Sequence, residues 1–292
     1  MCTIGAVATT DSQGNAIAFA LKNSDYMQVG HWHGCITGGA GNDFMGFNTS
    51  SRPGVNSGMN EKGLAVIRSF LDYRGPFDEK DEPVKEQKDF PLDIDRRSAI
   101  AAGLLERYET VEETLPYLHD VIPRHTGEGT GQRGGNFLLA DATGEVAILE
   151  HCEDRIESRV YAEGYSARGN NGRLILLDEQ ARLPGHVRED RETRCEYMQS
   201  ALEMLHESVP RGMSKEEALD SLKRTLAWKG PEGDGGVGSI CALNLRAPGA
   251  RTNSAQPCST RTAVIFDLIE KTMHFTRGNP DEYPWETMRF PA

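Results

Sequence analysis

The chain has 292 residues and a formal net charge of −12, from 32 Lys and Arg against 44 Asp and Glu. This acidity disfavours nucleic acid or an anionic membrane as a partner, because phosphate groups would be repelled. No apolar run approaches the roughly 20 residues that span a bilayer, and the N-terminus lacks the basic start of a secretory signal. We therefore expect a cytoplasmic protein, long enough to bury a sizeable core.

The first half of the chain predicts strands followed by helices. Apolar runs and turn residues predict, in chain order, a strand over 2–8, a turn over 11–15, a strand over 16–21, loops around short strands over 30–60 and a strand over 63–71. The segment 74–95 carries three prolines among charged residues, which predicts an exposed excursion. Apolar residues three to four positions apart then predict helices over 98–108 and 111–118.

The second half predicts strands, helices and strands again. In chain order we expect a glycine-rich loop over 127–135, a hairpin over 136–150, a strand over 155–165, helices over 190–207 and 214–227, and strands over 240–245, 263–268 and 272–276. Ser214 and Glu217 have the spacing of a capping box. Because the elements cluster by type rather than alternate, they favour an α+β fold of antiparallel sheets covered by helices, as one domain over 1–292.

Several familiar site motifs are absent or out of context. Two GxGxxG stretches, 129–134 and 233–238, each lead into a predicted strand rather than a helix, which argues against dinucleotide binding. His31 and His33 could share one side of a strand, but no third ligand has a suitable spacing, so we expect a surface or loop role. The six cysteines match no zinc pattern. The sequence predicts neither a metal nor a cofactor.

Cys2 differs from the other cysteines because it directly follows Met1. Removal of Met1 would leave a free α-amine on Cys2, and an α-amine titrates near ~8. The neutral amine can accept the thiol proton and later deliver it to a departing amine, while the thiol attacks a carbonyl carbon. The simpler alternative is that Cys2 is only a small residue after the start codon. A decision between the two needs the rest of the sequence.

Ordered blocks of sequence across nearly the whole chain favour the first interpretation. The blocks are Cys2-Thr3, Lys22–Asp25, Gly58–Val66, Asn136–Asp141, Thr143–Glu150, Arg168–Asn171, Ser239–Cys241, Ser259–Asp267 and Gly278–Glu282. Together they resemble the N-terminal-nucleophile (Ntn) cysteine hydrolases, which include penicillin V acylase, bile salt hydrolase and the isopenicillin N acyltransferase-like proteins. Each block alone is only modestly specific to this family. The whole set, found in the same order as in the family, is strong evidence for the resemblance.

The resemblance implies a four-layer αββα fold and a set of catalytic roles. Cys2 would be the nucleophile with its own amine as base, and Asp25 would hold the geometry of the cysteine. Asn170 would donate its side-chain amide to the oxyanion, with Asn171 as the neighbour that could be confused with it. Asn23 belongs to the same Asn-x-Asp segment as Asp25.

The chain departs from the family pattern at three places. Lys22 stands where bile salt hydrolases have an arginine. The lysine keeps the positive charge but cannot form the paired hydrogen bonds of a guanidinium group. Ser69 stands where an asparagine is usual, which weakens the second oxyanion donor or assigns it to the backbone. The family's late arginine has no firm counterpart, and Arg261 and Arg246 are the candidates.

Amide hydrolysis of the acylase type is the leading functional hypothesis, with a small-molecule amide as the partner. Three alternatives stay open: acyl transfer to an amine or from coenzyme A, dipeptidase activity, and a non-catalytic protein that retains the fold. Gly34-Cys35 is a competing start for a processed chain, although no Asn-x-Asp segment follows Cys35 at a comparable distance. From the resemblance we also expect a homo-oligomer, either a dimer or a tetramer.

Overall fold

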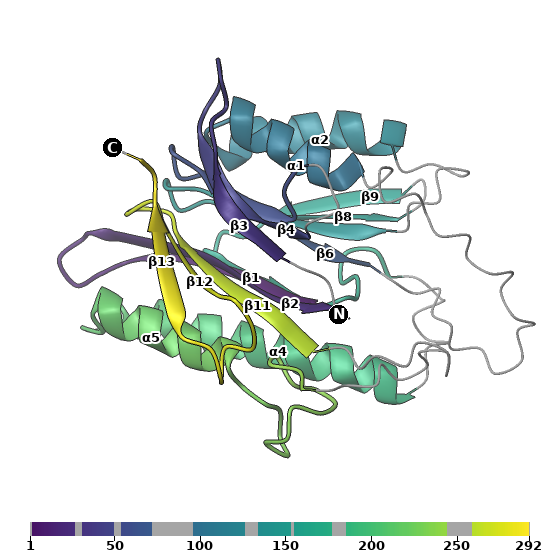
Figure 1. The fold of residues 1–292 in the computed structure, drawn as a ribbon, viewed down its shortest axis with the longest axis vertical. Helices are drawn as coiled ribbons and strands as arrows, with labels where there is room; N and C mark the ends of the chain where they lie inside the picture. The colour runs from purple at the N-terminus through teal and green to yellow at the C-terminus, as the bar shows by residue number, and fades with distance from the viewer. Residues whose placement is uncertain are drawn as a thin grey trace, which may run out of the picture.

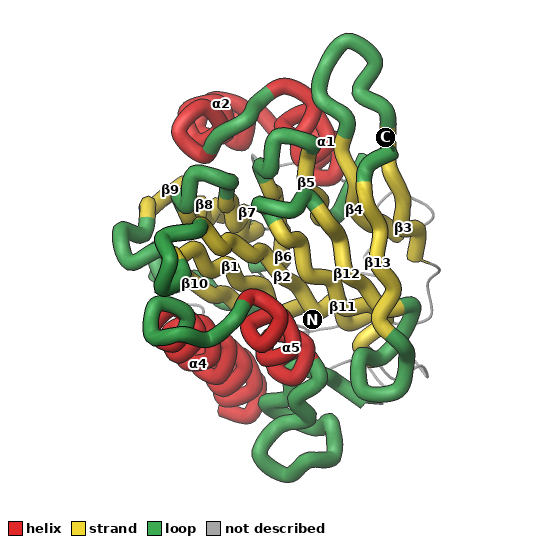
Figure 2. The backbone as a smooth tube through the Cα atoms, turned by 90° about the vertical axis from the view of Figure 1, so that its left-hand side faces the viewer, coloured by secondary structure: helices red, strands yellow, loops and turns green. Residues whose placement is uncertain are grey.

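The arrangement of the sheets and helices is that of four stacked layers. The computed structural model describes residues 2–26, 31–49, 54–71, 96–125, 134–152, 155–176, 185–243 and 259–291. They form two antiparallel sheets packed face to face, and helices cover the outer face of each sheet (Figure 1). Figure 2 shows the same layers from the side, with helices above the sheets and helices below them. The expected αββα architecture is confirmed.

One sheet has six strands and contains both ends of the described chain. In spatial order they are β10 (Tyr165–Arg168), β1 (Cys2–Thr10), β2 (Ala16–Tyr26), β11 (Ser259–Asp267), β12 (Thr272–Thr276) and β13 (Trp285–Arg289). The expected hairpin of β1 and β2 is confirmed. Its turn is closed by Asp11, whose Oδ1 accepts hydrogen bonds from the backbone N–H groups of Gln13 and Asn15, both at 2.8 Å.

The other sheet has seven strands in simple chain order. They are β3 (His31–Ile36), β4 (Phe44–Thr49), β5 (Ser57–Asn60), β6 (Ala65–Phe70), β7 (Gly135–Ala140), β8 (Val146–Cys152) and β9 (Arg155–Val160). Each strand pairs antiparallel with the next one along the chain. The expected strands around 63–71 and 136–150 are confirmed within this sheet.

The helices bury apolar faces on the outside of the sheets. They are α1 (Arg96–Arg107) and α2 (Val111–His125) over the seven-stranded sheet, and α4 (Gly185–Ser208) and α5 (Lys215–Leu226) over the six-stranded sheet. The capping box of α5 is present, with Ser214 and Glu217 bonded reciprocally. Helix α4 packs closely on β1 because Gly5 has no side chain: a Cβ there would lie 2.8 Å from Cδ1 of Leu202.

Side-chain alternation along the strands sends residues to two different cores. On β1, Ile4 and Ala6 face the opposite sheet, whereas Val7 joins the core under α4 and α5. On β2, Ala20 faces the opposite sheet and Leu21 faces the helices. Because alternate residues face opposite sides of a strand, this alternation also decides which polar side chains at the strand ends meet between the sheets.

Two expected strands differ from the structure. Residues 155–165 do not form one strand: β9 ends at Val160, and a turn with Gly164 at φ +75° sends β10 into the other sheet. Residues 240–242 are buried and 243 is half-buried, but they form no strand, because the backbone N–H of Ala242 is satisfied by Oγ1 of Thr260 rather than by a ladder partner. The glycine stretch 233–238 therefore leads into bends rather than a strand, and no helix follows it within the described residues.

Other expectations fall partly or wholly outside the described residues. The excursion over 74–95, most of the glycine-rich loop over 127–135 and residues 244–245 lie there. Strand β13 is an element that the sequence patterns did not predict. Among the described helices, none combines the length and the apolar character needed to cross a bilayer.

Candidate active site around Cys2

Cys2 opens β1 and lies buried between the two sheets. It is only 2% exposed, and the alternation of β1 places its side chain on the same face as Ile4, toward the seven-stranded sheet. Its neighbour across the hairpin is Ser24. The backbone nitrogen of Cys2 donates a hydrogen bond to Oδ1 of Asn170 at 2.7 Å. Figure 1 shows the N-terminus at one end of the six-stranded sheet, beside β2.

Lys22 places a buried ammonium beside Cys2. It shares the inward face of β2, and its Nζ donates to Oδ1 of Asn56 at 2.6 Å and to the backbone oxygen of Arg68. Burial lowers the pKa of Lys22 to about 8; the neighbouring Cys2 side chain opposes this shift and the Arg68 charge adds to it. The Lys22 side chain therefore lies within electrostatic reach of the thiol.

Asn170 is fixed at both ends of its side-chain amide. While Oδ1 accepts from Cys2, Nδ2 donates to the backbone oxygen of Phe70 at 2.8 Å. Its own backbone oxygen accepts from Nη1 of Arg191, on α4, at 3.0 Å. Asn171 follows without a positive φ, so this segment is not the left-handed turn that an Asn-Asn-Gly sequence often forms. Asn170, rather than Asn171, is the asparagine bonded to Cys2.

Ser69 and Asn136 form a polar pair on the seven-stranded sheet. Both contact the loop that carries Asn170, residues 169–175, which we call the Asn170 loop. They are directly opposite each other on β6 and β7, and Nδ2 of Asn136 donates to Oγ of Ser69 at 3.0 Å. Both then bond to the backbone oxygen of Gly169, Ser69 at 2.9 Å and Asn136 at 3.2 Å. Asn136 was not identified as a site residue from the sequence. The signal available in the sequence was a polar residue at a position where strand alternation with Leu138 predicts core.

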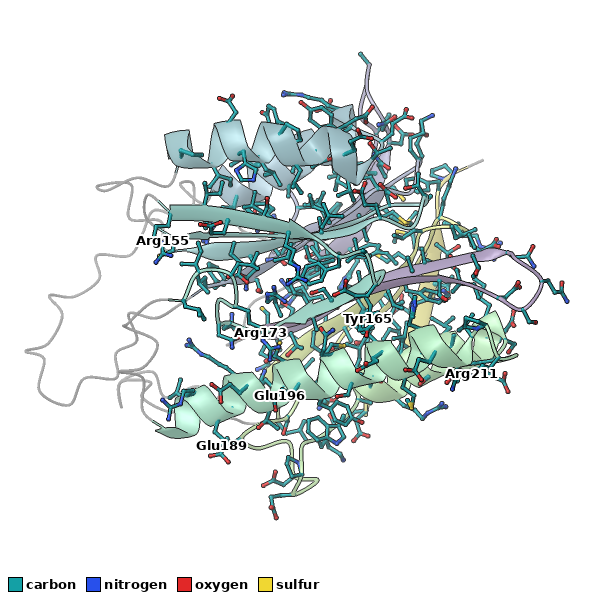
Figure 3. All side chains as sticks on the ribbon, turned by 180° about the vertical axis from the view of Figure 1, so that it is seen from behind. Arg155, Tyr165, Arg173, Glu189, Glu196 and Arg211 are labelled. Carbon is teal, nitrogen blue, oxygen red and sulfur yellow. The ribbon has the colours of Figure 1, made fainter. Side chains whose placement is uncertain are left out.

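Glu150 holds the remainder of the same loop. Its carboxylate is fully buried and accepts from the backbone N–H groups of Arg173, Leu174 and Ile175 at 2.9 to 3.0 Å. It also forms an ion pair with Nε of Arg168 at 2.7 Å, which joins β8 of one sheet to β10 of the other. Figure 3 shows Arg173 beside the half of α4 that carries Glu189 and Glu196. The loop is thus clamped from both sheets and from α4.

Asp25 and Asn23 lie on the opposite face of β2 from Lys22. Nδ2 of Asn23 donates to the backbone oxygens of Leu226 and Ile240, at 2.8 and 2.9 Å. The Asp25 carboxylate accepts from Nη1 of Arg194 at 2.7 Å. Both residues lie within β2, so they belong to a strand rather than a turn. Their contacts lie toward the helix layer. Whether Asp25 also orients the Cys2 amine stays a prediction.

Arg194 is a buried cation between two carboxylates. Besides Asp25, its Nε pairs with Oδ1 of Asp190 at 3.1 Å within α4. Although burial opposes it, the Asp190 and Asp25 charges raise the pKa of Arg194, so the guanidinium stays charged. Oγ1 of Thr260, on β11, donates to the other oxygen of Asp25 at 2.7 Å. The network ties β2, β11 and α4 together at the end of the sheet where Cys2 lies.

Arg261 is placed away from the Cys2–Lys22 contact. It lies half-buried on β11, at a register irregularity between Thr260 and Thr262. Together with His31 and His33 it lines a pocket. Both histidines are half-buried on strand β3 and line that pocket, so they do not lie in a loop, which was one of the two roles expected for them. Arg246, the other candidate arginine, is outside the described residues. Within the described ranges, no three His, Cys, Asp or Glu side chains are grouped to hold a metal ion.

Comparison with known proteins identifies the fold. Neither protein-family models nor curated proteins give a match to this chain. Penicillin V acylase from Agrobacterium tumefaciens is similar in structure, with a TM-score of 0.55 and 16% identity over 97% of this chain and 86% of that one. The C2A mutant of conjugated bile acid hydrolase from Clostridium perfringens has a TM-score of 0.50 and 12% identity over 99% of this chain and 97% of that one. The chain therefore has the four-layer Ntn-hydrolase fold.

Proposed function

We propose that the chain is an amide C–N hydrolase of the acylase type that acts through a thioester on Cys2. The observation that carries the proposal is the hydrogen bond from the Cys2 nitrogen to Oδ1 of Asn170, made at a buried strand end beside the Lys22 ammonium. An atom that serves as general base needs a fixed position, and this nitrogen has one. The names acylase and hydrolase of the two structures with this fold support the reaction class.

The Cys2 nitrogen becomes the general base once Met1 is removed. As a free amine it donates one N–H to Asn170 and keeps a lone pair for the thiol proton. The Cys2 sulfur then attacks the amide carbon, the C–N bond breaks, and the proton passes from the amine to the departing nitrogen. Water adds to the thioester, which releases the acid and restores the thiol.

The positive charge of Lys22 stabilises the negative charge that develops in both steps. Two of its three N–H donors are taken by Asn56 and the Arg68 carbonyl, and the third is left for the Cys2 side. A fixed donor in a buried site contributes about 3 kcal/mol to such stabilisation. Nδ2 of Asn170 donates to Phe70 in the resting geometry, so its donation to an oxyanion requires that bond to be exchanged.

Cys35 is a weaker candidate for the nucleophile. It lies inside β3, opposite Met45, so cleavage before Cys35 would cut a strand that is paired along its length. Burial and the Asp43 charge raise the pKa of the Cys35 thiol, which lowers the fraction of reactive thiolate. Neither the position nor the chemistry of Cys35 favours catalysis.

Turnover by matched cysteine variants tests the proposal. Protein confirmed to start at Cys2 is incubated with N-acyl amino acids, β-lactams and small peptides, and compared with Cys2→Ala and Cys195→Ala. Cys195 is buried on α4, where its thiol donates to the backbone oxygen of Ala167 on β10, and serves as the control. We expect hydrolysis by the wild type and by Cys195→Ala, none by Cys2→Ala, and similar melting curves for all three. Retained activity in Cys2→Ala would contradict the proposal, and products that carry an added amine or thiol acceptor would indicate acyl transfer instead.

A further inference from the structure

Arg194 is a charged residue in an otherwise apolar stripe of α4. Residues 194, 198 and 202 are four apart, so they lie on one side of the helix. Met198 and Leu202 pack on β1, where a Cβ on Gly5 would lie 2.8 Å from Leu202 and 3.2 Å from Met198. Arg194, one turn earlier, is 1% exposed and pairs with Asp25. The stripe therefore changes from apolar to charged at the end of the sheet where the chain begins.

The Arg194 guanidinium and Thr260 fix both oxygens of the Asp25 carboxylate. Nη1 of Arg194 donates to Oδ2 at 2.7 Å, and Oγ1 of Thr260 donates to Oδ1 at 2.7 Å. The Thr260 oxygen itself accepts from the backbone N–H of Ala242 at 2.9 Å, which leaves its proton for Asp25. Asp190 holds the guanidinium from the other side, through Nε at 3.1 Å. The orientation of the Asp25 carboxylate is therefore set by two separate elements, α4 and β11.

Asp25 lies beside the backbone nitrogen of Cys2. Ser24 is opposite Cys2 in the antiparallel β1–β2 pair, so the next residue of β2 lies beyond Cys2 on the side of its nitrogen. Neighbouring strands lie about 5 Å apart, a gap that an aspartate side chain spans. Asn170 follows β10 on the other flank of β1 and accepts from the same nitrogen at 2.7 Å. The nitrogen of Cys2 thus lies between two acceptors that come from opposite flanks of its strand.

The same turn of α4 holds both of these acceptors. Besides Arg194 it carries Arg191, whose Nη1 donates to the backbone oxygen of Asn170 at 3.0 Å. Stability alone does not account for such a buried ion network, because apolar residues in place of a buried ion pair are often equally stable. A role in placing the two acceptors accounts for both arginines.

We propose that Arg194 is a positioning residue of the hydrolase: it aims the Asp25 carboxylate at the Cys2 amine, which donates one N–H to Asp25 and the other to Asn170. The inference rests on the proposed function, because it concerns the amine that acts as base. A neutral amine has two N–H groups and one lone pair. With both N–H groups held, the lone pair keeps one direction, toward the thiol of the same residue. Arg194 does not touch the substrate and acts only through Asp25.

The charges around the amine set the sign of the expected pKa changes. An anion beside an ammonium group raises its pKa, and a cation lowers it. The other titratable groups that face this end of the sheet are Lys22 on β2, Arg68 on β6, Asp190 and Arg191 on α4, and Cys241. Burial raises the pKa of Cys241 to about 12, so this thiol is neutral. Asp25→Asn should therefore lower the pKa of the amine, and Arg194→Met should raise it.

The titration of the amine tests the inference without any substrate. Protein that starts at Cys2 is labelled with nitrogen-15 cysteine, and the chemical shift of the amine nitrogen is followed as the pH rises. We expect the amine pKa to rise by about one pH unit or more in Arg194→Met and to fall by as much in Asp25→Asn. In Arg194→Lys, which keeps the charge, it should stay close to the wild-type value. Leu205→Ala, buried on α4 about three turns beyond Arg194, is the control and should lower the melting temperature alone.

Turnover separates a role through Asp25 from a merely structural one. The substrate is the member of the panel of N-acyl amino acids, β-lactams and peptides that the wild type hydrolyses fastest. We expect kcat per folded molecule to fall at least tenfold in Arg194→Met and in Asp25→Asn, with KM within threefold of the wild type. The acid limb of kcat/KM should move to higher pH in Arg194→Met, because the amine must lose its proton before it acts.

A combined variant, Asp25→Asn with Arg194→Met, completes the test. It leaves no unpaired charge at position 25, so it serves where Arg194→Met alone does not fold. Because Arg194 acts only through Asp25, its kcat should be within threefold of that of Asp25→Asn. A further tenfold loss in the combined variant, or a folded Arg194→Met protein with the wild-type amine pKa and kcat, would overturn the inference.

The two measurements also separate this inference from the proposed function. Turnover by the wild type, with an amine pKa that none of the variants changes, would remove the link between Arg194 and the amine and leave the hydrolase proposal intact. Changed amine pKa values in a protein that hydrolyses no member of the panel would contradict the hydrolase proposal alone, and would leave Arg194 as the residue that holds Asp25 at the amine.

Discussion

The space between the two sheets has an apolar end and a polar end, although the same strands build both. On β8, Ile148 lies in the apolar core, and Glu150, two residues further along the same face, forms a buried ion pair. On β7, Leu138 lies in that core and Asn136, two residues earlier, bonds to the Asn170 loop. All four side chains are fully buried. The fold needs the apolar end, and the proposed chemistry needs the polar one.

This difference separates the energetic roles of the two ends. Apolar burial at the first end stabilises the fold by roughly 25 cal/mol per Å² removed from water. At the polar end, buried charges and amides cost free energy unless each has a hydrogen-bond partner. A buried ion pair with good geometry does no more than offset that cost. Substitutions at the apolar end should therefore lower stability alone. Substitutions at the polar end should also lower activity.

The largest expected effect comes from blocking the amine of Cys2 without changing any side chain. A chain with one glycine added before Cys2 has an amide where the proposed base should be. Because a positioned general base contributes 10²–10⁴-fold, we expect kcat/KM to fall by about that factor while the melting temperature is retained. The same glycine added after Ala292 is the control. Full activity in the N-terminally extended protein would remove the amine from the mechanism.

Glu150→Gln should lower both stability and activity. The variant leaves the Arg168 guanidinium buried without its counter-charge, which costs about 3–5 kcal/mol in the free energy of unfolding. It also weakens the clamp on the loop that carries Asn170, and a misplacement near 1 Å lowers kcat by about 10²-fold. Urea unfolding and kcat per folded molecule measure the two effects.

Glu157→Gln is the matched control for Glu150→Gln. Glu157 is exposed on β9, directly opposite Glu150, so its substitution should change the free energy of unfolding by no more than about 0.5 kcal/mol. A Glu150→Gln protein that loses stability but keeps full kcat would show that the clamp does not position Asn170.

Ile148→Ala tests the apolar end of the same strand. Removal of this fully buried side chain should lower the free energy of unfolding by about 2–5 kcal/mol, and the milder Ile148→Val by about 0.5–1.5 kcal/mol. Because Ile148 lies in the apolar core, kcat per folded molecule should not change. A large loss of kcat in Ile148→Val would mean that the two ends are not separable.

Lys22→Arg should alter the pH profile more than the rate at neutral pH. The pKa of Lys22 is about 8, so the cation is present below that pH and lost as the pH rises through it. Because the amine of Cys2 must instead be neutral, wild-type kcat/KM should follow a bell shape with an alkaline fall near pH 8. Arginine stays charged, so Lys22→Arg should lose that fall. An unchanged alkaline limb in the variant would contradict the role of Lys22.

The stability of the protein should also depend on Lys22 with a defined sign. The pKa of Lys22 is lowered from 10.5, so between pH 8 and 10.5 the unfolded chain binds more protons than the folded one. The Lys22 contribution to the free energy of unfolding therefore rises with pH across that window. Urea unfolding of the wild type relative to Lys22→Met, at pH 8 and pH 10, should show the wild type gaining stability.

Sequence patterns predicted most of the fold because apolar alternation and turn residues are local signals. They found the β1–β2 hairpin and the capping box of α5. They missed the turn at Gly164 that moves β10 into the other sheet, since a change of sheet leaves strand periodicity unaltered. Residues 240–243 resembled a strand because they are apolar, but their backbone is satisfied by contacts distant in sequence.

Candidate site residues were predicted only where a motif or a terminus marked them. Cys2 and Asn170 came from position and resemblance, and the structure brings the two together. Asn136 and Glu150 occupy inward strand positions where the pattern predicts core, so only their tertiary partners show what they contact. His33 is another such case, because its contact with Thr262 joins positions more than 200 residues apart in the sequence.

Intact mass spectrometry of acid-quenched turnover tests the central claim most directly. The account predicts a protein that lacks Met1 and carries one acyl group on the peptide that begins at Cys2, with the adduct released by hydroxylamine. An active protein that retains Met1, an acyl group on a peptide beginning at Cys35, or turnover without any covalent adduct would contradict it.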